Sequence, residues 1–126
     1  MNAERASQGR APLRWSAPLA ASANAHSKVE GMNGAMGHTF KGEASPPDRM
    51  TKAGYRPLWA WGENVAYRYP QCGRNAEQME YNMFNEGPHG QHRINILFSQ
   101  YTDVGIGVYV DANGWMWLTE DFGGHG

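Results

Sequence analysis

The feature that most constrains the fold is an alternation of apolar residues with glycine near the C-terminus. Over seven positions the sequence reads Val104, Gly105, Ile106, Gly107, Val108, Tyr109 and Val110. This two-residue period predicts a β-strand. Asn113-Gly114 suits a turn with positive φ, which predicts a hairpin into a second strand over residues 115–119. Because the glycines leave one face of the first strand bare, we expect a helix or the wall of a ligand site against it.

The preceding two thirds of the chain predict mainly helices. One helix is expected over residues 2–9, followed by an extended link that carries Leu13 and Trp15 into the core. Ser16 is a good N-cap for a second helix, whose small residues suit close packing on a sheet and which ends at Gly31–Gly34. Helices first and strands last are typical of α+β layering.

The middle of the chain divides into five shorter segments. Glycine and proline predict a loop before the third helix, and aromatic residues dominate the extended segment after it. Met79 and Met83 mark the clearest amphipathic helix, which Gly87-Pro88 stops, and the last helix is expected to point Ile94, Leu97 and Phe98 inward. The segments are a loop over 33–48, a helix over Pro47–Ala53, extended chain over 55–69, a helix from Asn75 and a helix over 91–98.

Composition limits the partners and the core. The net charge is -1, from 11 basic and 12 acidic residues without a basic block, which argues against nucleic acid or an anionic membrane as a partner. Aliphatic residues are scarce, so five Trp, six Tyr and seven Met predict an aromatic and methionine-rich core. No stretch approaches the roughly 18 apolar residues of a membrane span.

Length and cysteine content limit the organisation. The 126 residues predict a single domain, residues 1–126, that is long enough to bury a core. The lone Cys72 cannot form an internal disulfide, and we interpret it as an isolated thiol. The opening residues look like the end of a helix without its beginning, so we expect a trimmed or mature form.

Three stretches carry most of the candidate chemistry, and we expect them to converge on one cleft. They are Gly37-His38-Thr39, Gly62-Glu63-Asn64 and Glu86–Leu97. The last one holds His89 and His92, a His-x-x-His spacing that suits a metal only on a helix. Pro88 and Gly90 make His89 a loop residue instead, and the motif lacks the glutamate of a zinc-protease helix.

Other motifs of catalysis are missing from the sequence. It contains no nucleophile elbow, phosphate loop, paired cysteines or dinucleotide fingerprint, so we expect no organic cofactor. An enzyme with this sequence would need acid/base or metal-assisted chemistry. His26 is a further ionisable candidate, although a lone histidine is more often a satisfied structural group.

An ordered set of short motifs resembles the CAP superfamily, the SCP-like domain of cysteine-rich secretory, antigen and pathogenesis-related proteins. The likeness is greatest to its single-domain bacterial members and covers nearly the whole chain. The motifs are Asn2-x-x-Arg5, Pro12-Leu13-x-Trp15, Leu19 with Ala23 and His26, Gly37-His38, Ala53-Gly54-Tyr55, Gly62-Glu63-Asn64-Val65-Ala66, His92-Arg93-x-Asn95-Ile96-Leu97, Tyr101-Thr102-x-Val104-Gly105-x-Gly107-Val108 and Asp121-Phe122-Gly123.

The resemblance implies a fold, a location and a site. It implies a three-layer α-β-α sandwich with a mostly antiparallel central sheet, and a secreted protein. It also implies a cleft lined by two histidines and two glutamates, which are the candidates for catalysis. Matched residue by residue, these are His38, Glu63, Glu86 and His92, with Glu80 as the alternative to Glu86.

The resemblance also implies what the cleft could hold. Where family members bind a divalent metal, the histidines are the ligands, so His38 and His92 are the candidate ligands of zinc or another divalent cation. Two carboxylates close together are expected to raise one pKa, which would give the cleft an acid and a base.

Three functions remain open at this point. The first is a secreted binding module, a monomer whose cleft takes a small lipid, a peptide or a cell-wall fragment. The second is a metal- or acid/base-assisted hydrolase of peptide or cell-wall bonds. The third is a structural extracellular protein in which the four cleft residues only brace the fold.

Overall fold

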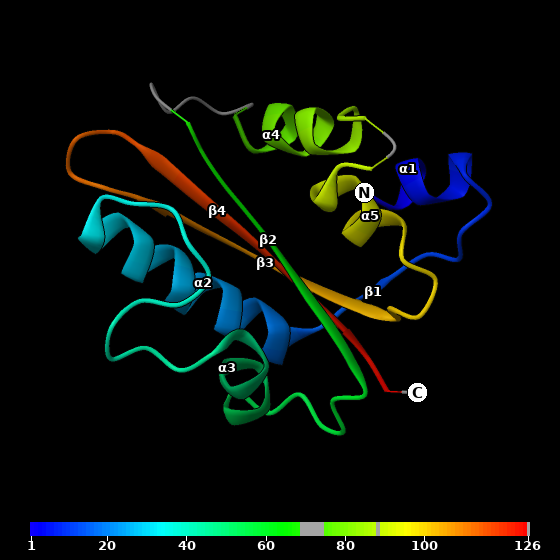
Figure 1. Ribbon diagram of the computed structural model, residues 1–126, viewed down its shortest axis with the longest axis horizontal. Coiled ribbons are helices and arrows are strands. Elements are labelled where there is room, and N and C mark those ends of the chain that lie inside the picture. The colour runs from blue at the N-terminus through cyan, green and yellow to red at the C-terminus, as the bar shows by residue number, and fades with distance from the viewer. Residues whose placement is uncertain (69–74, 88, 126) are drawn as a thin grey trace.

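The computed structural model describes residues 1–68, 75–87 and 89–125. Cys72 and Pro88 lie outside these residues. Among the described residues the chain forms five helices and four strands (Figure 1). In chain order they are α1 (Asn2–Ser7), β1 (Arg14–Trp15), α2 (Ala17–Asn33), α3 (Pro46–Lys52), β2 (Ala60–Arg68), α4 (Asn75–Phe84), α5 (Gln91–Leu97), β3 (Asp103–Val110) and β4 (Met116–Gly124).

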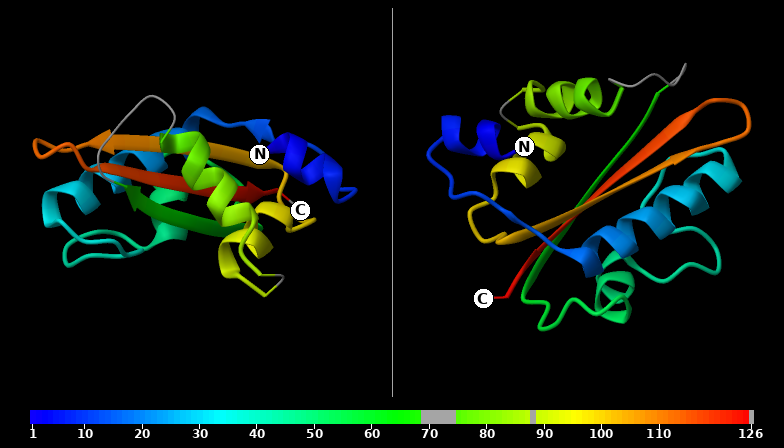
Figure 2. Two further views of the ribbon diagram at one scale, coloured as in Figure 1. Left: turned by 90° about the horizontal axis from the view of Figure 1, so that it is seen from above. Right: turned by 180° about the vertical axis from the view of Figure 1, so that it is seen from behind.

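A four-stranded sheet in the order β1-β3-β4-β2 separates two helical layers. Helices α2 and α3 lie on one side of it, and α1, α4 and α5 lie on the other (Figures 1 and 2). The pairs β3–β4 and β4–β2 are antiparallel, whereas β1 runs parallel to β3. The predicted α+β sandwich with a mostly antiparallel sheet is therefore confirmed, with one parallel edge pair.

The bare glycine face of β3 is covered by α2, as the sequence predicted. A Cβ atom on Gly105 would lie 1.9 Å from the backbone nitrogen of Ala20, and one on Gly107 would lie 2.2 Å from that of Asn24. The helix begins at the predicted cap, where the Ser16 hydroxyl accepts a hydrogen bond from the backbone N–H of Leu19. Small residues on both sides thus let helix and sheet backbones touch.

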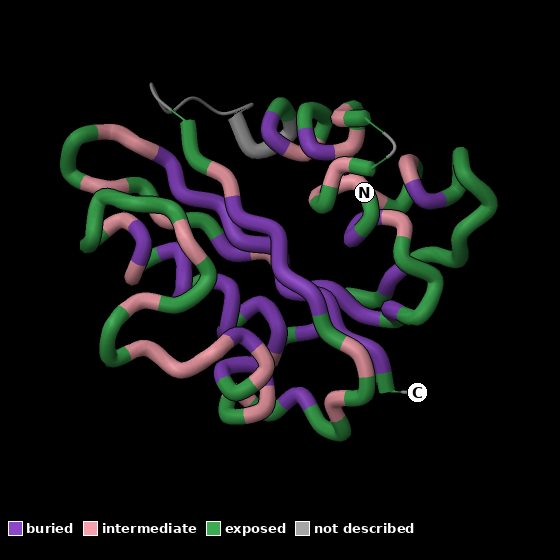
Figure 3. The backbone as a smooth tube through the Cα atoms, viewed as in Figure 1, coloured by how far each residue is buried: buried purple, intermediate pink, exposed green. Residues whose placement is uncertain are grey.

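The opposite face of the sheet carries the main hydrophobic core. The central stretches of the strands are buried, as their purple colour in Figure 3 shows. Met79 and Met83 of α4 pack in this core with Ile96 of α5 and Phe122 of β4. The prediction of a core rich in methionine and aromatic residues is confirmed for these side chains. It fails for three tryptophans, which are exposed: Trp15, Trp59 and Trp61.

Two local predictions of buried residues were wrong. Leu13 is buried, but Trp15 is exposed because β1 is a two-residue strand at the edge of the sheet. In α5 the buried pair is Asn95 and Ile96, whereas the predicted Ile94 and Phe98 are exposed. Hydrogen bonds from the Asn95 amide to β2 set the rotation of this short helix.

Candidate functional site

The first half of the candidate site is a histidine held against a buried carboxylate. His38 lies in the loop between α2 and α3, and its Nδ1 atom is 2.9 Å from Oε1 of Glu63 on β2. The Glu63 side chain is fully buried, whereas the His38 side chain is 56% exposed. The carboxylate therefore orients the imidazole from behind and leaves its other edge toward solvent.

Arg49 of α3 holds the same carboxylate from the other side. Its Nη1 and Nη2 atoms donate to Oε2 and Oε1 of Glu63 at 2.9 and 3.1 Å, and Nη2 also donates to the carbonyl oxygen of His38 at 2.9 Å. One guanidinium thus binds both the carboxylate and the backbone of the loop that carries the imidazole. Such a two-pronged contact fixes geometry as well as charge.

Further charged groups surround this pair. Asp121 of β4 lies opposite Glu63 in the strand register, with its Oδ2 atom 3.6 Å from Nη1 of Arg49. His26 of α2 is buried and presents one ring nitrogen to Glu43 and the other to the carbonyl oxygen of Gly37. Neither nitrogen of His26 is left for a metal or a ligand, so this candidate is a structural group.

The pKa values of the two neighbouring acids are shifted in opposite directions. Burial alone would raise the pKa of Glu63, but hydrogen bonds with His38, Asp121 and Arg49 and the charge of Arg49 outweigh it and lower that pKa to about 2. Burial and the adjacent Glu63 raise the pKa of Asp121 well above its usual value. The hydrogen bond to Glu63 also raises the pKa of His38. At neutral pH Glu63 is a fixed anion.

The second half of the site is the pair of Glu86 and His92. Nδ1 of His92 at the start of α5 lies 3.1 Å from Oε2 of Glu86, whose Oε1 accepts the backbone N–H of Arg93 at 3.0 Å. Both side chains are partly exposed and line a cavity of about 250 Å³. Burial alone would raise the pKa of Glu86, but the hydrogen bonds from Arg93 and His92 together outweigh it and lower that pKa.

Two successive residues of β2 connect the halves. Glu63 faces the α2 side and binds His38, while the amide nitrogen of Asn64 faces the α5 side and donates to the carbonyl oxygen of His92 at 3.1 Å. Strand β2 is the edge of the sheet, and the contacts of Glu63 and Asn64 place the two histidine–glutamate pairs on opposite faces of it. The dipeptide Glu63-Asn64 is the common support of both pairs.

The structure thus brings together the sequence candidates in two pairs, His38 with Glu63 and Glu86 with His92. Glu86, and not the alternative Glu80, lies beside His92. His89 is exposed in the turn before α5, as predicted for a loop residue. The expectation of one raised carboxylate pKa is not met, because each carboxylate is paired with its own histidine and both pKa values are lowered.

Both histidines offer a nitrogen that a metal could use. Each imidazole uses Nδ1 for its carboxylate, which orients Nε2 away from it, the arrangement common in metal-binding histidines. Within the part of the chain that the structure describes, no three or more His, Cys, Asp or Glu side chains are grouped to hold a metal ion. Zinc here would have at most two imidazole ligands, and the remaining positions would fall to water or ligand.

Comparison with known proteins identifies the family. The model of the CAP family, the cysteine-rich secretory protein family, matches residues 1–122. The chain belongs to the CAP family. A Bacillus subtilis (strain 168) protein described as the uncharacterized membrane protein YlbC is 34% identical over 107 residues, which are 85% of this chain and 29% of that protein. Within the described residues, no helix of this CAP domain is long and apolar enough to cross a membrane.

Solved structures share the fold. An extracellular SCP-domain protein from Bacillus anthracis str. Ames matches with a TM-score of 0.80 and 27% identity over 98% of this chain and 37% of that chain. An outer surface protein from Borrelia burgdorferi matches with a TM-score of 0.82 and 16% identity over 99% of this chain and 86% of that chain. The CAP domain thus spans about a third of the two Bacillus proteins.

Several residues that hold the CAP site were missed by the sequence reasoning. Arg49 sits in a helix of seven residues, where an arginine ordinarily indicates a solvated surface. Glu43 lies in a loop without any motif. Asp121 was part of a recognised motif, but nothing in its spacing indicated that it would lie opposite Glu63. Only the strand register and the α3 contact bring these charges together.

A second group of carboxylates lies on the other face of the CAP sheet. Glu120 of β4 is buried and accepts a hydrogen bond from the Asn64 amide, and Glu80 of α4 and Glu4 of α1 lie close to it, with the Met1 amino group 3.6 Å from Glu4. Among the described residues no donor reaches either oxygen of Glu80. Burial and the neighbouring acids raise the pKa values of Glu80 and Glu4 to about 8.

We therefore expect the stability of this CAP domain to fall as the pH rises from about 5 to about 9. The folded state holds protons on Glu80 that the unfolded chain loses near pH 4.5, so this contribution is present below that pH and is lost as the pH rises through about 8. Glu80→Gln should flatten the decline, measured as the urea unfolding free energy between about pH 5 and about pH 9.

The matched control is Asp48→Asn, which removes one exposed surface charge on α3. It should leave the decline as steep as in the wild type. A Glu80→Gln variant that loses stability with pH as steeply as the wild type would show that Glu80 is already ionised in the fold.

Proposed function

We propose that this CAP domain is a secreted binding module that takes a small ligand, a lipid, peptide or cell-wall fragment, at the β2 edge between its two histidine–glutamate pairs. The observation that carries the proposal is that the two side chains of each pair differ in charge state and exposure. The carboxylate is fixed and ionised, and the imidazole is exposed in front of it. Preorganised polar groups beside an open cavity are typical of ligand sites.

The same observation favours binding over hydrolysis. A general acid or base works best with a pKa near the operating pH, and hydrolysis by two carboxylates needs one of them protonated. Glu63 and Glu86 both have lowered pKa values, and Arg49 already occupies both oxygens of Glu63. Neither carboxylate is tuned for proton transfer at neutral pH.

Secretion is proposed from relatives. The family is described as secretory, and the Bacillus anthracis protein that is 27% identical is described as extracellular. These descriptions belong to those proteins. They support a location outside the cytoplasm for this domain as well.

The test is a thermal unfolding series with one probe of each ligand class: palmitate, a tetra-alanine peptide and a soluble disaccharide-tetrapeptide from peptidoglycan. A ligand at about ten times its Kd contributes about 1.4 kcal/mol, which should raise the Tm by roughly 3–6 °C. We expect one probe to do so for the wild type and to lose the effect in Glu86→Gln, which removes the anion beside His92. Three probes without a shift would refute the proposal, and cleavage of a probe would establish the hydrolase.

A second candidate function, divalent metal binding, is favoured by the use of Nδ1 in both histidine–glutamate pairs. Calorimetric titration of untagged protein with zinc sulfate should show binding that His38→Ala or His92→Ala weakens at least tenfold. His89→Ala is the matched control, because it removes an exposed imidazole three residues before His92. Equal zinc binding in all three variants would exclude these ligands.

A further inference from the structure

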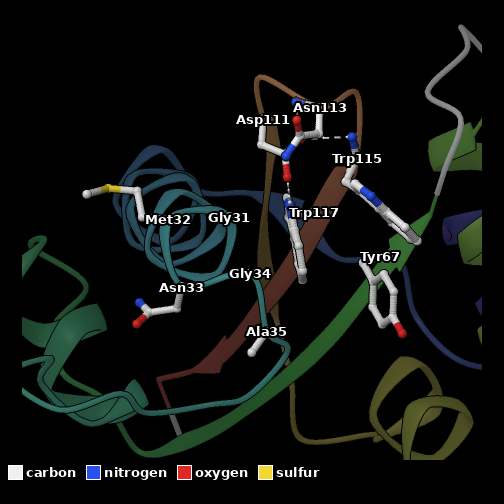
Figure 4. A pocket seen from close by; sticks show the side chains of 10 residues that line it. All are labelled: Gly31, Met32, Asn33, Gly34, Ala35, Tyr67, Asp111, Asn113, Trp115 and Trp117. Atoms are coloured by element: carbon white, nitrogen blue, oxygen red, sulfur yellow. Dashed lines mark hydrogen bonds between the residues drawn. The ribbon is translucent and has the colours of Figure 1, made fainter.

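A separate aromatic cavity lies at the C-terminal end of β2, away from Glu63 and the residues that bind it. Its volume is about 570 Å³. Figure 4 shows one wall made by the end of α2 and the opposite wall made by Tyr67, Trp115 and Trp117, with Asp111 and Asn113 of the β3–β4 hairpin above them. The cavity therefore lies between a helix end and an aromatic surface.

The aromatic wall follows from the strand register. Tyr67 of β2 and Tyr109 of β3 both pair with Trp117 of β4, so the three rings form one row across the face that α2 covers. At Gly31 the helix packs so closely that an added Cβ would lie 2.5 Å from the Tyr109 ring. The helix then ends at Gly34, which leaves the Tyr67 end of the row uncovered, and Tyr67 is 48% exposed.

The rings form a platform rather than a cage. The centroids of Tyr67 and Trp117 are 5.2 Å apart with an interplanar angle of 23°, and those of Tyr67 and Trp115 are 5.4 Å apart. Rings in contact leave no gap between them for a quaternary ammonium group, which needs ring faces around it. A continuous aromatic surface instead suits the flat, C–H-bearing face of a pyranose ring.

Among the described residues that line the cavity there are acceptors and amides but no basic side chain. The Asp111 carboxylate accepts hydrogen bonds from the backbone of Asn113 and Trp115 and from Nε1 of Trp117, all at about 3.0 Å (Figure 4). The C-terminal end of α2 adds partial negative charge to the opposite wall. This environment disfavours phosphates and fatty-acid carboxylates, whereas hydroxyl groups can donate to it.

The aromatic cavity shares one lining residue with the Glu86–His92 cavity. Tyr67 lines the aromatic cavity and also the cavity of about 250 Å³ that holds Glu86 and His92. A ligand longer than one ring can therefore run from the aromatic platform over the β2 edge toward His92. The position of Tyr67 between the two cavities favours a chain of linked rings over a single compact molecule.

We propose that the aromatic cavity binds a pyranose ring of a neutral glycan chain, stacked on the exposed Tyr67 beside Trp115, whereas Trp117 is only 4% exposed and supports the Tyr67 ring from within. This site is separate from the histidine–glutamate pairs. The proposal names a carbohydrate as the ligand, and it can hold whether or not the pairs bind anything.

The probes are the β-1,4-linked tetramers of N-acetylglucosamine and of glucose, added to ¹⁵N-labelled protein. Each tryptophan gives one indole N–H signal, assigned by single Trp→Phe variants. We expect the signals of Trp115 and Trp117 to shift in a saturable way with at least one tetramer, and the signal of the exposed Trp15 on β1 to stay. No shift of Trp115 and Trp117 at about 10 mM tetramer would overturn the proposal, as would a shift produced by tetramethylammonium instead.

Variants of Tyr67 separate stacking from a structural effect. Tyr67→Ala should weaken tetramer binding at least tenfold, and Tyr67→Phe, which keeps the ring, should retain it. Trp15→Ala is the matched control, since it removes an exposed aromatic outside the cavity.

The Glu86→Gln variant should still show the tetramer-induced shifts of the Trp115 and Trp117 signals. Failure of the histidine–glutamate site and failure of the glycan site are therefore distinguishable. Equal affinity in Tyr67→Ala and wild type would refute the stacking.

Discussion

Replacing Gly105 with alanine is expected to destabilise the domain by about 3 kcal/mol or more. The added Cβ would lie 1.9 Å from the backbone nitrogen and 2.6 Å from the Cα of Ala20. Backbone atoms cannot rotate away as a side chain can, so α2 must move off the sheet. Alanine would otherwise be favoured over glycine in a strand by roughly 0.5–1 kcal/mol, and the clash outweighs that gain.

Urea unfolding at neutral pH measures this effect, with Gly87→Ala as the matched control. Gly87 has open space around the position of an added Cβ and ordinary φ, so its substitution should change the unfolding free energy by less than about 0.5 kcal/mol. A Gly105→Ala variant as stable as Gly87→Ala would show that α2 is not packed on β3 as closely as the structure places it.

The arrangement of α2 on β3 was the most predictable part of the fold, because both of its causes are local. Alternating glycines set the bare face of the strand, and a run of small residues after Ser16 sets the helix that fits it. The length of β4 was less predictable. Its predicted end at Thr119 was too early, since the strand continues to Gly124 through the buried charges Glu120 and Asp121. Buried acids break the apolar pattern that identifies a strand from sequence.

The candidate site was predictable only as separate pieces. Short motifs around His38, Glu63 and His92 marked the residues, but their spacing in the chain says nothing about which side chains meet. The pairing of each histidine with its own carboxylate depends on two loops and on the opposite faces of β2. The decisive cation, Arg49, comes from a short helix with no pattern of its own. A buried charge is thus recognised by its partners, and those are set by tertiary structure.

Arg49→Met is the variant from which we expect the largest loss at the site, about 3–5 kcal/mol of unfolding free energy. Methionine keeps the apolar stem but leaves the fully buried Glu63 carboxylate without the guanidinium that binds both of its oxygens. Asp121 cannot compensate, because it is itself an acid. Arg56→Met, which removes an exposed arginine just after α3, should cost less than about 0.5 kcal/mol under the same conditions.

The pH dependence of the same variant gives an independent check. In the wild type the lowered pKa of Glu63 contributes stability above about pH 4.5, and this contribution is lost as the pH falls toward 2. Without Arg49 the pKa of Glu63 should rise, so the variant should lose less stability than the wild type between neutral and acidic pH.

A double variant decides whether the cost comes from the unpaired charge or from the packing of α3. Glu63→Gln removes the negative charge with little change of shape, so Arg49→Met/Glu63→Gln should recover part of the stability lost in Arg49→Met. If the double variant is instead less stable than Arg49→Met by the full cost of Glu63→Gln alone, the two residues act independently. The ion pair would then not be what positions His38, and the bracing of the exposed imidazole would have to come from the loop itself.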